Sequence, residues 1–500
     1  MPSDYLHSLY TGFIPRRERS VDSKTLWAAI CSITLVQWGH FWCGWLAWIC
    51  DSFDFFSVSL SVTNLEKQFN KPPGTITTAI TLTLLFRSLG AFIFGVLSDR
   101  YGRKWPLVAN LLIAAAFELG SGFVQTFPQF LAVRSLFGVA MGGIWGLASS
   151  TALENLPVEA RGLASGFLQE GYAVGYLIAA VVNLTLVPET SSGWRGLFWL
   201  GAGLSVLAAA VRAVLPESEL FLRAKAVERA QGRTTVNKTR VFMHETWEML
   251  KRHWILCCYA VLLMTGFNFL SHGSQDLYPT YLTTTKGFSQ HDATVATIIG
   301  NCGAIAGGTV AGWLSQYAGR RLTIIMFVVI VGAFIPLWIL PSTFGALAAG
   351  AFCIQFGVQG AWGVIPIQLN EMSPPAFRAT FPGVAYQIGN MVSSASAQIE
   401  ATGAAHLKKV TTIVNGEPKL VANYATVQGI LVGVVAAFVV LCTIVGPENH
   451  GSRFEKYKAA FEEGAGRDEE MPDVEEVQDS ADASSRAASI REVREKDLDV

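Results

Sequence analysis

The stretch Gly95-Val-Leu-Ser-Asp99-Arg-Tyr-Gly102-Arg103-Lys104 decides the fold, because the chain carries it twice. A second copy, Gly312-Trp-Leu-Ser-Gln316-Tyr-Ala-Gly319-Arg320-Arg321, begins 217 residues later. The same offset aligns two further blocks without a gap: Gly143-Ile-Trp145-Gly146 with Gly360-Ala-Trp362-Gly363, and Glu154, Pro157, Arg161 and Gly166 with Glu371, Pro374, Arg378 and Gly383. Three blocks in one register indicate that the chain is a duplicated unit.

Long apolar segments lie on both sides of each copy. Hydrophobic residues make up 51% of the chain and charged residues 15%, against roughly 25% charged residues in an average soluble protein. A backbone in hydrocarbon must satisfy its own hydrogen bonds, so such segments become helices of roughly 20 residues. The sequence predicts an all-α membrane protein with twelve spans, near 39–62, 75–97, 105–124, 129–151, 161–182, 194–215, 253–281, 290–314, 321–340, 344–369, 377–398 and 424–446.

The positive charges predict the orientation. If the spans are correct, most Lys and Arg residues lie on one side, and only six lie on the other: Lys67, Lys71, Lys286, Lys408, Lys409 and Lys419. Because Lys and Arg are retained on the cytoplasmic side, both termini and the long central loop are expected there. The formal net charge of -1 gives no indication of nucleic-acid binding.

The duplication divides the chain into two six-helix bundles, 39–215 and 253–446, related by a pseudo-two-fold axis. Repeats of equal orientation have that axis along the membrane normal, and substrate sites lie between them near the midplane. The remaining parts are a cytoplasmic N-terminal segment, 1–38, a cytoplasmic central loop, 216–252, and a tail, 447–500. The tail is rich in Glu, Asp, Ser and Ala, so we expect it to be disordered and a candidate for binding trafficking or regulatory proteins.

The seventh span carries a polar face. On a helix, Asn268, Ser271, His272, Gln275 and Asp276 share one side. Such groups are costly in a bilayer and usually face a cavity or a partner. Hydrogen bonding between helices is the alternative explanation, but five groups on one stripe exceed that need. His272 and Asp276 are one turn apart, which makes them the first candidates for holding a proton.

Arg87 in the second span is the other unusual residue, about 18 Å from Asp99 at the cytoplasmic end. At that depth a guanidinium needs an anion, and its planar fork matches a carboxylate in two parallel hydrogen bonds. The anion is either a substrate or an internal carboxylate, and both can alternate. The internal candidates are Asp51, Asp54 and Glu170.

The eleventh span places Gln387, Asn390 and Ser394 on one face. At the 217-residue offset Gln387 corresponds to Glu170, so each half carries a long polar side chain at the same depth. Arg134 and Glu118 are predicted to form a structural pair nearer the outer side.

The repeated loop resembles the signature between the second and third helices of the major facilitator superfamily, with 312–321 as its weaker second copy. In the seventh span, Asn268-Phe-Leu-Ser271-His272-Gly-Ser274-Gln275-Asp276-Leu-Tyr-Pro-Thr280 is similar to the N-x-x-[ST]-H-x-[ST]-Q-D-x-x-x-T signature of fungal lactate/pyruvate–proton symporters, in the sialate–proton branch. The resemblance implies the major facilitator fold and multi-pass insertion in the plasma membrane. It also implies uptake of short carboxylates with a proton.

The resemblance places substrate contacts in the second, fifth, seventh and eleventh helices. The expected substrate-binding residues are Arg87, Asn268, Ser271, His272, Gln387 and Asn390, and the expected proton-coupling residues are His272, Asp276 and Glu170. It also implies a latch at the cytoplasmic face, formed by Asp99, Arg103, Glu154 and Arg161. Gln316 replaces Asp99 in the second copy, so the corresponding latch is expected to be weaker there.

The predicted function is a proton-coupled symporter that imports lactate, pyruvate and related acids by alternating access. Beyond the proton as coupling ion, no cofactor, metal site or catalytic residue is expected, and an enzyme is improbable because no nucleophile–base pair, metal spacing or nucleotide loop is present. Three alternatives stay open: a dicarboxylate symporter for succinate or malate, a sugar, polyol or cationic-metabolite porter on the same fold, and a non-transporting nutrient sensor.

Overall fold

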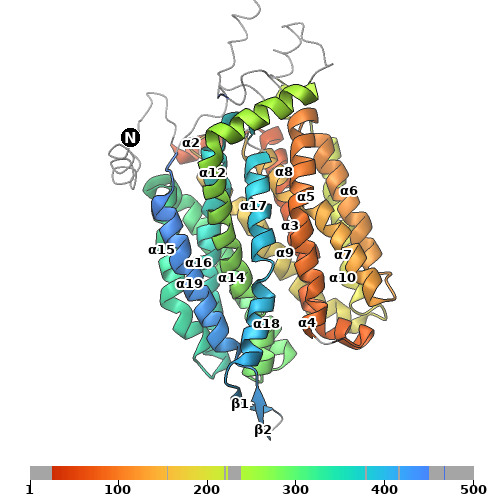
Figure 1. The fold of residues 1–500 in the computed structure, drawn as a ribbon. Helices are drawn as coiled ribbons and strands as arrows, with labels where there is room; N and C mark the ends of the chain where they lie inside the picture. The colour runs from red at the N-terminus through yellow and green to blue at the C-terminus, as the bar shows by residue number, and fades with distance from the viewer. Residues whose placement is uncertain are drawn as a thin grey trace, which may run out of the picture.

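The computed structural model describes residues 25–71, 73–154, 156–218, 221–222, 238–377, 380–414, 417–449 and 467. Two helical bundles stand side by side (Figure 1). The amino-terminal bundle comprises α3 (Leu35–Phe69), α5 (Thr78–Tyr101), α6 (Lys104–Ser121), α7 (Phe127–Met141), α8 (Ile144–Leu153), α9 (Arg161–Glu189) and α10 (Arg195–Val214). The carboxyl-terminal bundle comprises α12 (Lys238–Gln275), α14 (Gln290–Ala318), α15 (Arg320–Ile339), α16 (Phe344–Met372), α17 (Thr380–Ser393), α18 (Ser396–His406) and α19 (Tyr424–Val445).

Short elements connect the long helices: α2 (Leu26–Cys31), α4 (Pro73–Ile76), α13 (Tyr278–Thr280), a π-helical turn (Tyr281–Thr285) and a 3₁₀ turn (Pro375–Phe377). An antiparallel hairpin, β1 (Val410–Val414) and β2 (Glu417–Val421), precedes α19 and pairs Val410 with Val421. The sequence did not predict this hairpin. Residues 1–24 of the N-terminal segment, residues 219–220 and 223–237 of the central loop, most of the tail, and Arg378 lie outside the described residues.

Each of the twelve predicted spans coincides with one long helix or with two helices in series. Among the described residues, nine helices are long and apolar enough to cross a membrane. The remaining predicted spans coincide with α3, with α6, and with α17 followed by α18. The membrane fold is therefore confirmed.

The fourth and eleventh spans differ from the prediction because each is interrupted. α7 and α8 are separated by Gly142 and Gly143, and α17 and α18 by Ser394 and Ala395. A Cβ atom on Gly142 would lie 1.9 Å from the carbonyl oxygen of Arg87. Glycine thus allows the fourth span to pack directly against the turn of α5 that carries Arg87.

The repeated loop has the same geometry in both halves. Gly102 and Gly319 end α5 and α14 with φ of 95° and 88° and an extended ψ, a backbone region that is essentially restricted to glycine. Arg103 then pairs with Glu154 (2.9 Å), and Arg320 pairs with Glu371 (3.0 Å).

A second shared feature of the loop is an acidic cap that the sequence reasoning missed. Glu217 accepts hydrogen bonds from the backbone N–H groups of Arg103 and Lys104 (2.9 and 3.1 Å). Glu448 does the same for Arg320 and Arg321 (3.0 and 2.9 Å). Each carboxylate thereby satisfies donors at a helix N-terminus. The signal was a Pro-Glu pair, at 216–217 and 447–448, after the sixth and twelfth spans.

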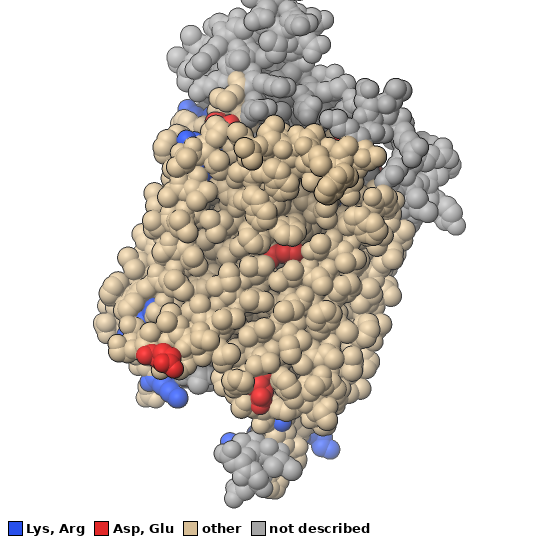
Figure 2. All heavy atoms as spheres, turned by 180° about the vertical axis from the view of Figure 1, so that it is seen from behind, with Lys and Arg blue, Asp and Glu red and all other residues tan. Residues whose placement is uncertain are grey.

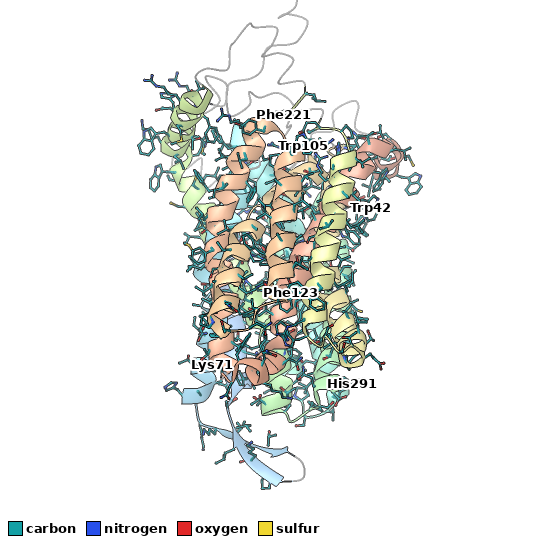
Figure 3. The ribbon with its side chains drawn as sticks, turned by 90° about the vertical axis from the view of Figure 1, so that its right-hand side faces the viewer. Trp42, Lys71, Trp105, Phe123, Phe221 and His291 are labelled. Atoms are coloured by element: carbon teal, nitrogen blue, oxygen red, sulfur yellow. The ribbon has the colours of Figure 1, made fainter. Side chains whose placement is uncertain are left out.

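The surface is divided into an apolar middle and two polar ends. In Figure 2, tan side chains cover most of the middle of the visible face, and blue atoms lie mainly toward its ends. Figure 3 labels Trp105 and Phe221 near one end and Lys71 and His291 near the other. We call the end that carries Arg103 and Arg320 the basic end, and the end that carries β1 and β2 the hairpin end.

Candidate functional site

Arg87 is buried, with 2% of its surface exposed, and its partner among the three predicted carboxylates is Asp51 of α3. The contact is a single hydrogen bond from Nη2 to Oδ2, 3.2 Å long. Nε of Arg87 and Oδ1 of Asp51 have no hydrogen-bond partner in the structure. Because a guanidinium and a carboxylate can form two parallel bonds, this pair is incomplete, and the guanidinium can bind another carboxylate.

His272 and Asn390 form a chain of polar contacts between α12 and α17. His272 Nδ1 lies 3.0 Å from Asp276 Oδ2, and His272 Nε2 lies 3.2 Å from Asn390 Oδ1. Asn390 donates through Nδ2 to Oε1 of Gln387 (2.9 Å). The structure therefore brings together four of the predicted site residues, although two helices far apart in the sequence supply them.

The two ring nitrogens of His272 face different partners. Nδ1 faces the Asp276 carboxyl and Nε2 faces the Asn390 side-chain amide, and which nitrogen donates depends on the tautomer of the imidazole. A protonated imidazole donates from both nitrogens, so the His272–Asp276 pair can hold one proton more than a neutral imidazole beside a carboxylate.

Aromatic side chains join the two halves at this level. Phe55 of α3 lies 5.2 Å from the guanidinium carbon of Arg87 and 6.0 Å from the His272 ring, measured to ring centroids. The Tyr386 hydroxyl interacts with both Arg87 and Asn390. Trp145 and Trp362, which correspond at the 217-residue offset, both contact the Tyr386 ring (4.6 and 5.6 Å).

Asn268, Ser271 and Gln275 are also buried, but their contacts differ. Asn268 donates to the Met264 carbonyl (2.9 Å) and to the Tyr386 carbonyl (3.3 Å), so it joins α12 to α17. Gln275 donates to Gln355 (2.7 Å) and lines a small cavity. That cavity is lined by Tyr176, Ser274, Gln275, Tyr278, Ala296, Thr297, Gly300, Asn301, Trp338, Ala351 and Gln355. The side chains of the predicted polar face therefore point in two directions: Asn268 toward α17, and Gln275 toward the cavity.

Glu170 does not reach Arg87. Its carboxyl group lies in the seam between α9 and α14, against Gly308, and neither of its oxygens has a hydrogen-bond partner in the structure. A Cβ atom on Gly308 would lie 1.4 Å from Oε1 of Glu170. A buried carboxyl without a cation is stable only when it is protonated, so Glu170 remains a candidate proton carrier between the two halves.

Gly308→Ala is expected to destabilise the purified protein by about 1–3 kcal/mol, because the new methyl group overlaps the Glu170 carboxyl. Glu170→Ala in the same chain should recover much of that loss, and Glu170→Gln alone should change the melting temperature little. Thermal unfolding of the wild type, Gly308→Ala, Glu170→Ala and the double variant measures the coupling. A loss of about 3–5 kcal/mol in Glu170→Gln would instead indicate a cationic partner.

Three of the four predicted latch residues come together at the basic end. Arg103 pairs with Asp99 (2.7 Å) and with Glu154 (2.9 Å), and the surrounding carboxylates raise the pKa of the Arg103 guanidinium. Arg161 donates through Nε to the Leu156 carbonyl (2.9 Å). Asp99 also accepts a hydrogen bond from Thr380 of α17, which connects the two halves. In the second half Arg320 pairs with Glu371 and Ser315.

The predicted pair between Arg134 and Glu118 is confirmed, with 2.6 Å between Nη1 and Oε2. Both side chains are fully buried. Arg134 also donates to the backbone carbonyl of Asp54 (3.4 Å), and Ser205 donates to the Asp54 carboxylate (3.2 Å). These contacts hold the guanidinium of Arg134, which is the second arginine at membrane depth in the amino-terminal half after Arg87.

Sequence reasoning missed Glu400, a fully buried acid in α18. Gln428 of α19 donates to its Oε2 (2.9 Å), and Ser396 donates to its Oε1 (3.4 Å). Glu400 follows the predicted end of the eleventh span, and the interruption at Ser394 gave no local signal. In the described residues no group of three or more His, Cys, Asp or Glu side chains could hold a metal ion.

Comparison with known proteins gives the same fold. A sequence profile of the Major Facilitator Superfamily matches residues 44–397. The chain is 34% identical over 458 residues to a carboxylic acid transporter protein homolog of Saccharomyces cerevisiae, covering 89% of this chain and 73% of the relative. It is 25% identical over 350 residues to the sialic acid transporter NanX of Escherichia coli, covering 69% and 82%. A proton:xylose symporter, XylE bound to 6-bromo-6-deoxy-D-glucose, superposes with a TM-score of 0.63 at 18% identity, covering 84% and 98%.

Proposed function

Since the chain belongs to the Major Facilitator Superfamily and is a multi-pass membrane transporter, we propose that it imports short monocarboxylates, such as lactate and pyruvate, together with protons across the plasma membrane. Both termini and the basic end face the cytoplasm in this proposal. The observation that carries it is the incomplete ion pair between Arg87 and Asp51, deep in the bundle and beside the junction of the two halves.

A carboxylate substrate replaces Asp51 on the guanidinium. The planar fork of Arg87 offers it two parallel hydrogen bonds, where Asp51 takes one. The substrate then lies near Phe55 and Tyr386, which contact both Arg87 and the His272 chain. Asn268, Ser271, Gln387 and Asn390 supply the polar groups around it.

The proton is held by His272 and Asp276, and Glu170 is a second carrier in the seam. The substrate adds one negative charge to the Arg87–Asp51 pair, and the extra proton of the His272–Asp276 pair adds one positive charge, so the site with both ligands carries the same net charge as the empty site. Because buried net charge is costly in the bilayer, a transporter that holds the substrate without the proton rearranges less readily than one that holds both. Coupling is the difference in affinity of each ligand between the two states.

The proposed preference for substrates with one carboxylate, rather than two, follows from the contacts of Arg134. A dicarboxylate such as succinate needs a further cation, and Arg134 is already held by Glu118 at 2.6 Å. A pure sugar porter does not need Arg87 at all. The sensor alternative requires the same site to bind without flux.

The test is uptake of labelled lactate, pyruvate, succinate and glucose against external pH, in cells that lack their own transporters. Lactate uptake should increase as external pH falls, pyruvate should compete, and succinate and glucose should not. Uptake of glucose without competition from acids would contradict the proposal. Purified protein in liposomes should move lactate, and binding without flux there would favour a sensor.

A further inference from the structure

The first part of α12, residues 240–252, is an amphipathic segment that sequence analysis assigned to the central loop. It bends at His253 (φ −112°, ψ 19°) and continues directly into the seventh span. In Figure 1 this part of α12 runs across the long axes of the bundle helices, and in Figure 3 it projects sideways from the bundle, pale green at the upper left.

One face of this segment packs on the protein. Phe242, Glu245 and Met249 are each 5% or less exposed. The Phe242 ring contacts Phe377, in the turn before α17, with 6.1 Å between ring centroids. The orientation of the segment is therefore fixed, and the face that it turns away from the protein is defined.

The outward face is apolar. Met243 and Trp247 are each 59% exposed and Leu250 is 39% exposed, and on a helix they form one narrow stripe. Trp254, 59% exposed, and Ile255, 66% exposed, continue the apolar surface past the bend into the membrane span. A stripe of large apolar side chains without a protein cover is unfavourable in water.

Basic side chains border the stripe. Arg240 and Lys251 lie next to it on the helix, and Lys251 Nζ lies 5.4 Å from the Trp247 ring. Arg252 lies on the opposite side of the helix from the stripe. Of the two acidic side chains in 240–252, Glu245 is buried, and Glu248, which is not buried, pairs with Lys251 at 3.0 Å. Tryptophan with flanking Lys and Arg is typical of helices that lie in the headgroup layer.

We propose that residues 240–252 lie in the phospholipid headgroup layer at the basic end, with Met243, Trp247 and Leu250 inserted toward the acyl chains. Arg240 and Lys251 bind anionic headgroups beside the stripe. The continuity with the seventh span identifies the occupant as the bilayer, because Trp254 and Ile255 already belong to the membrane-facing surface. This binding site for anionic lipid does not depend on the transported substrate.

The test uses the full chain in liposomes and the difference in fluorescence between the wild type and Trp247→Phe. Phosphatidylcholine brominated on its acyl chains should quench the Trp247 signal, and aqueous iodide should not. Quenching by iodide alone would overturn the proposal. Protection from both quenchers would also overturn it, because a protein partner or a second copy would then cover the stripe.

Anionic specificity is tested with brominated phosphatidylserine. It should quench Trp247 more strongly than brominated phosphatidylcholine at equal mole fraction, because each basic residue near the surface enriches anionic lipid about fivefold. The double variant Arg240→Gln with Lys251→Gln should bring the ratio of the two quenching signals toward one. The matched control, Lys408→Gln with Lys409→Gln at the hairpin end, should leave it unchanged. Equal quenching in the wild type would refute the anionic site.

Discussion

Arg87→Gln is expected to abolish lactate uptake and to weaken lactate binding to the purified protein by roughly 10- to 100-fold. The estimate follows from one net charge-assisted hydrogen bond, about 1.5–3 kcal/mol, because the substrate forms two bonds to Arg87 and displaces the one from Asp51. The same change leaves Asp51 buried without a partner, which costs about 3–5 kcal/mol of stability. Uptake alone would therefore not separate a lost binding site from a poorly folded protein.

Two variants separate these effects. Arg134→Gln breaks the pair with Glu118, which is equally buried, so it should lower stability by a similar amount and retain lactate binding per folded molecule. Arg87→Gln with Asp51→Asn removes both charges of the first pair, so stability should recover and binding should not. Lactate binding is measured by calorimetry on purified protein. Normal binding by the double variant would remove Arg87 from the site.

His272→Gln is expected to separate lactate movement from the proton gradient. Accumulation of lactate at acidic external pH should fall by the coupling factor, typically about 5- to 150-fold. Exchange of internal labelled lactate for external unlabelled lactate should continue, because exchange needs no net proton movement. Asp276→Asn should have the same effect, since it removes the carboxylate that shares the proton with His272 Nδ1 at 3.0 Å.

A matched control is present in the same bundle. His291 and Asp292 lie 3.9 Å apart at the start of α14, and the His291 side chain is 69% exposed. His291→Gln with Asp292→Asn removes the same two functional groups from the hairpin end, and we expect it to leave the pH dependence of uptake unchanged. Unchanged pH-driven accumulation in His272→Gln would show that the coupling proton is carried elsewhere, with Glu170 the next candidate.

Local sequence features determined the scaffold. Gly102 and Gly319 recur at one offset because each adopts a backbone conformation that is essentially restricted to glycine, at φ of 95° and 88°. Apolar length predicts helices in hydrocarbon without reference to any neighbour. Helical periodicity also placed His272 and Asp276 one turn apart, and the structure has them in contact.

The sequence alone could not identify which polar groups pair with one another in the folded protein. Three carboxylates were equally suitable for Arg87, and the packing of α3 against α5 gave that place to Asp51. Because Gly308 has no side chain, the Glu170 carboxyl lies against it, where neither oxygen has a hydrogen-bond partner among the described residues. The orientation of residues 240–252 likewise depends on a contact with a distant segment, Phe242 with Phe377.

The sequence by itself therefore determined a duplicated twelve-span membrane protein with a polar face in the seventh span and a guanidinium deep in the second, since these follow from composition, periodicity and backbone conformation within a few turns. Only the tertiary structure decided that Phe55, the counterpart of His272 in the first half, packs between Arg87 and His272, and that Asn390 reaches His272 from a helix 118 residues away. The physical reason is that hydrogen bonds and ion pairs in the bilayer form between whichever polar groups helix packing brings within reach. That packing depends on small residues and helix interruptions in both halves at once.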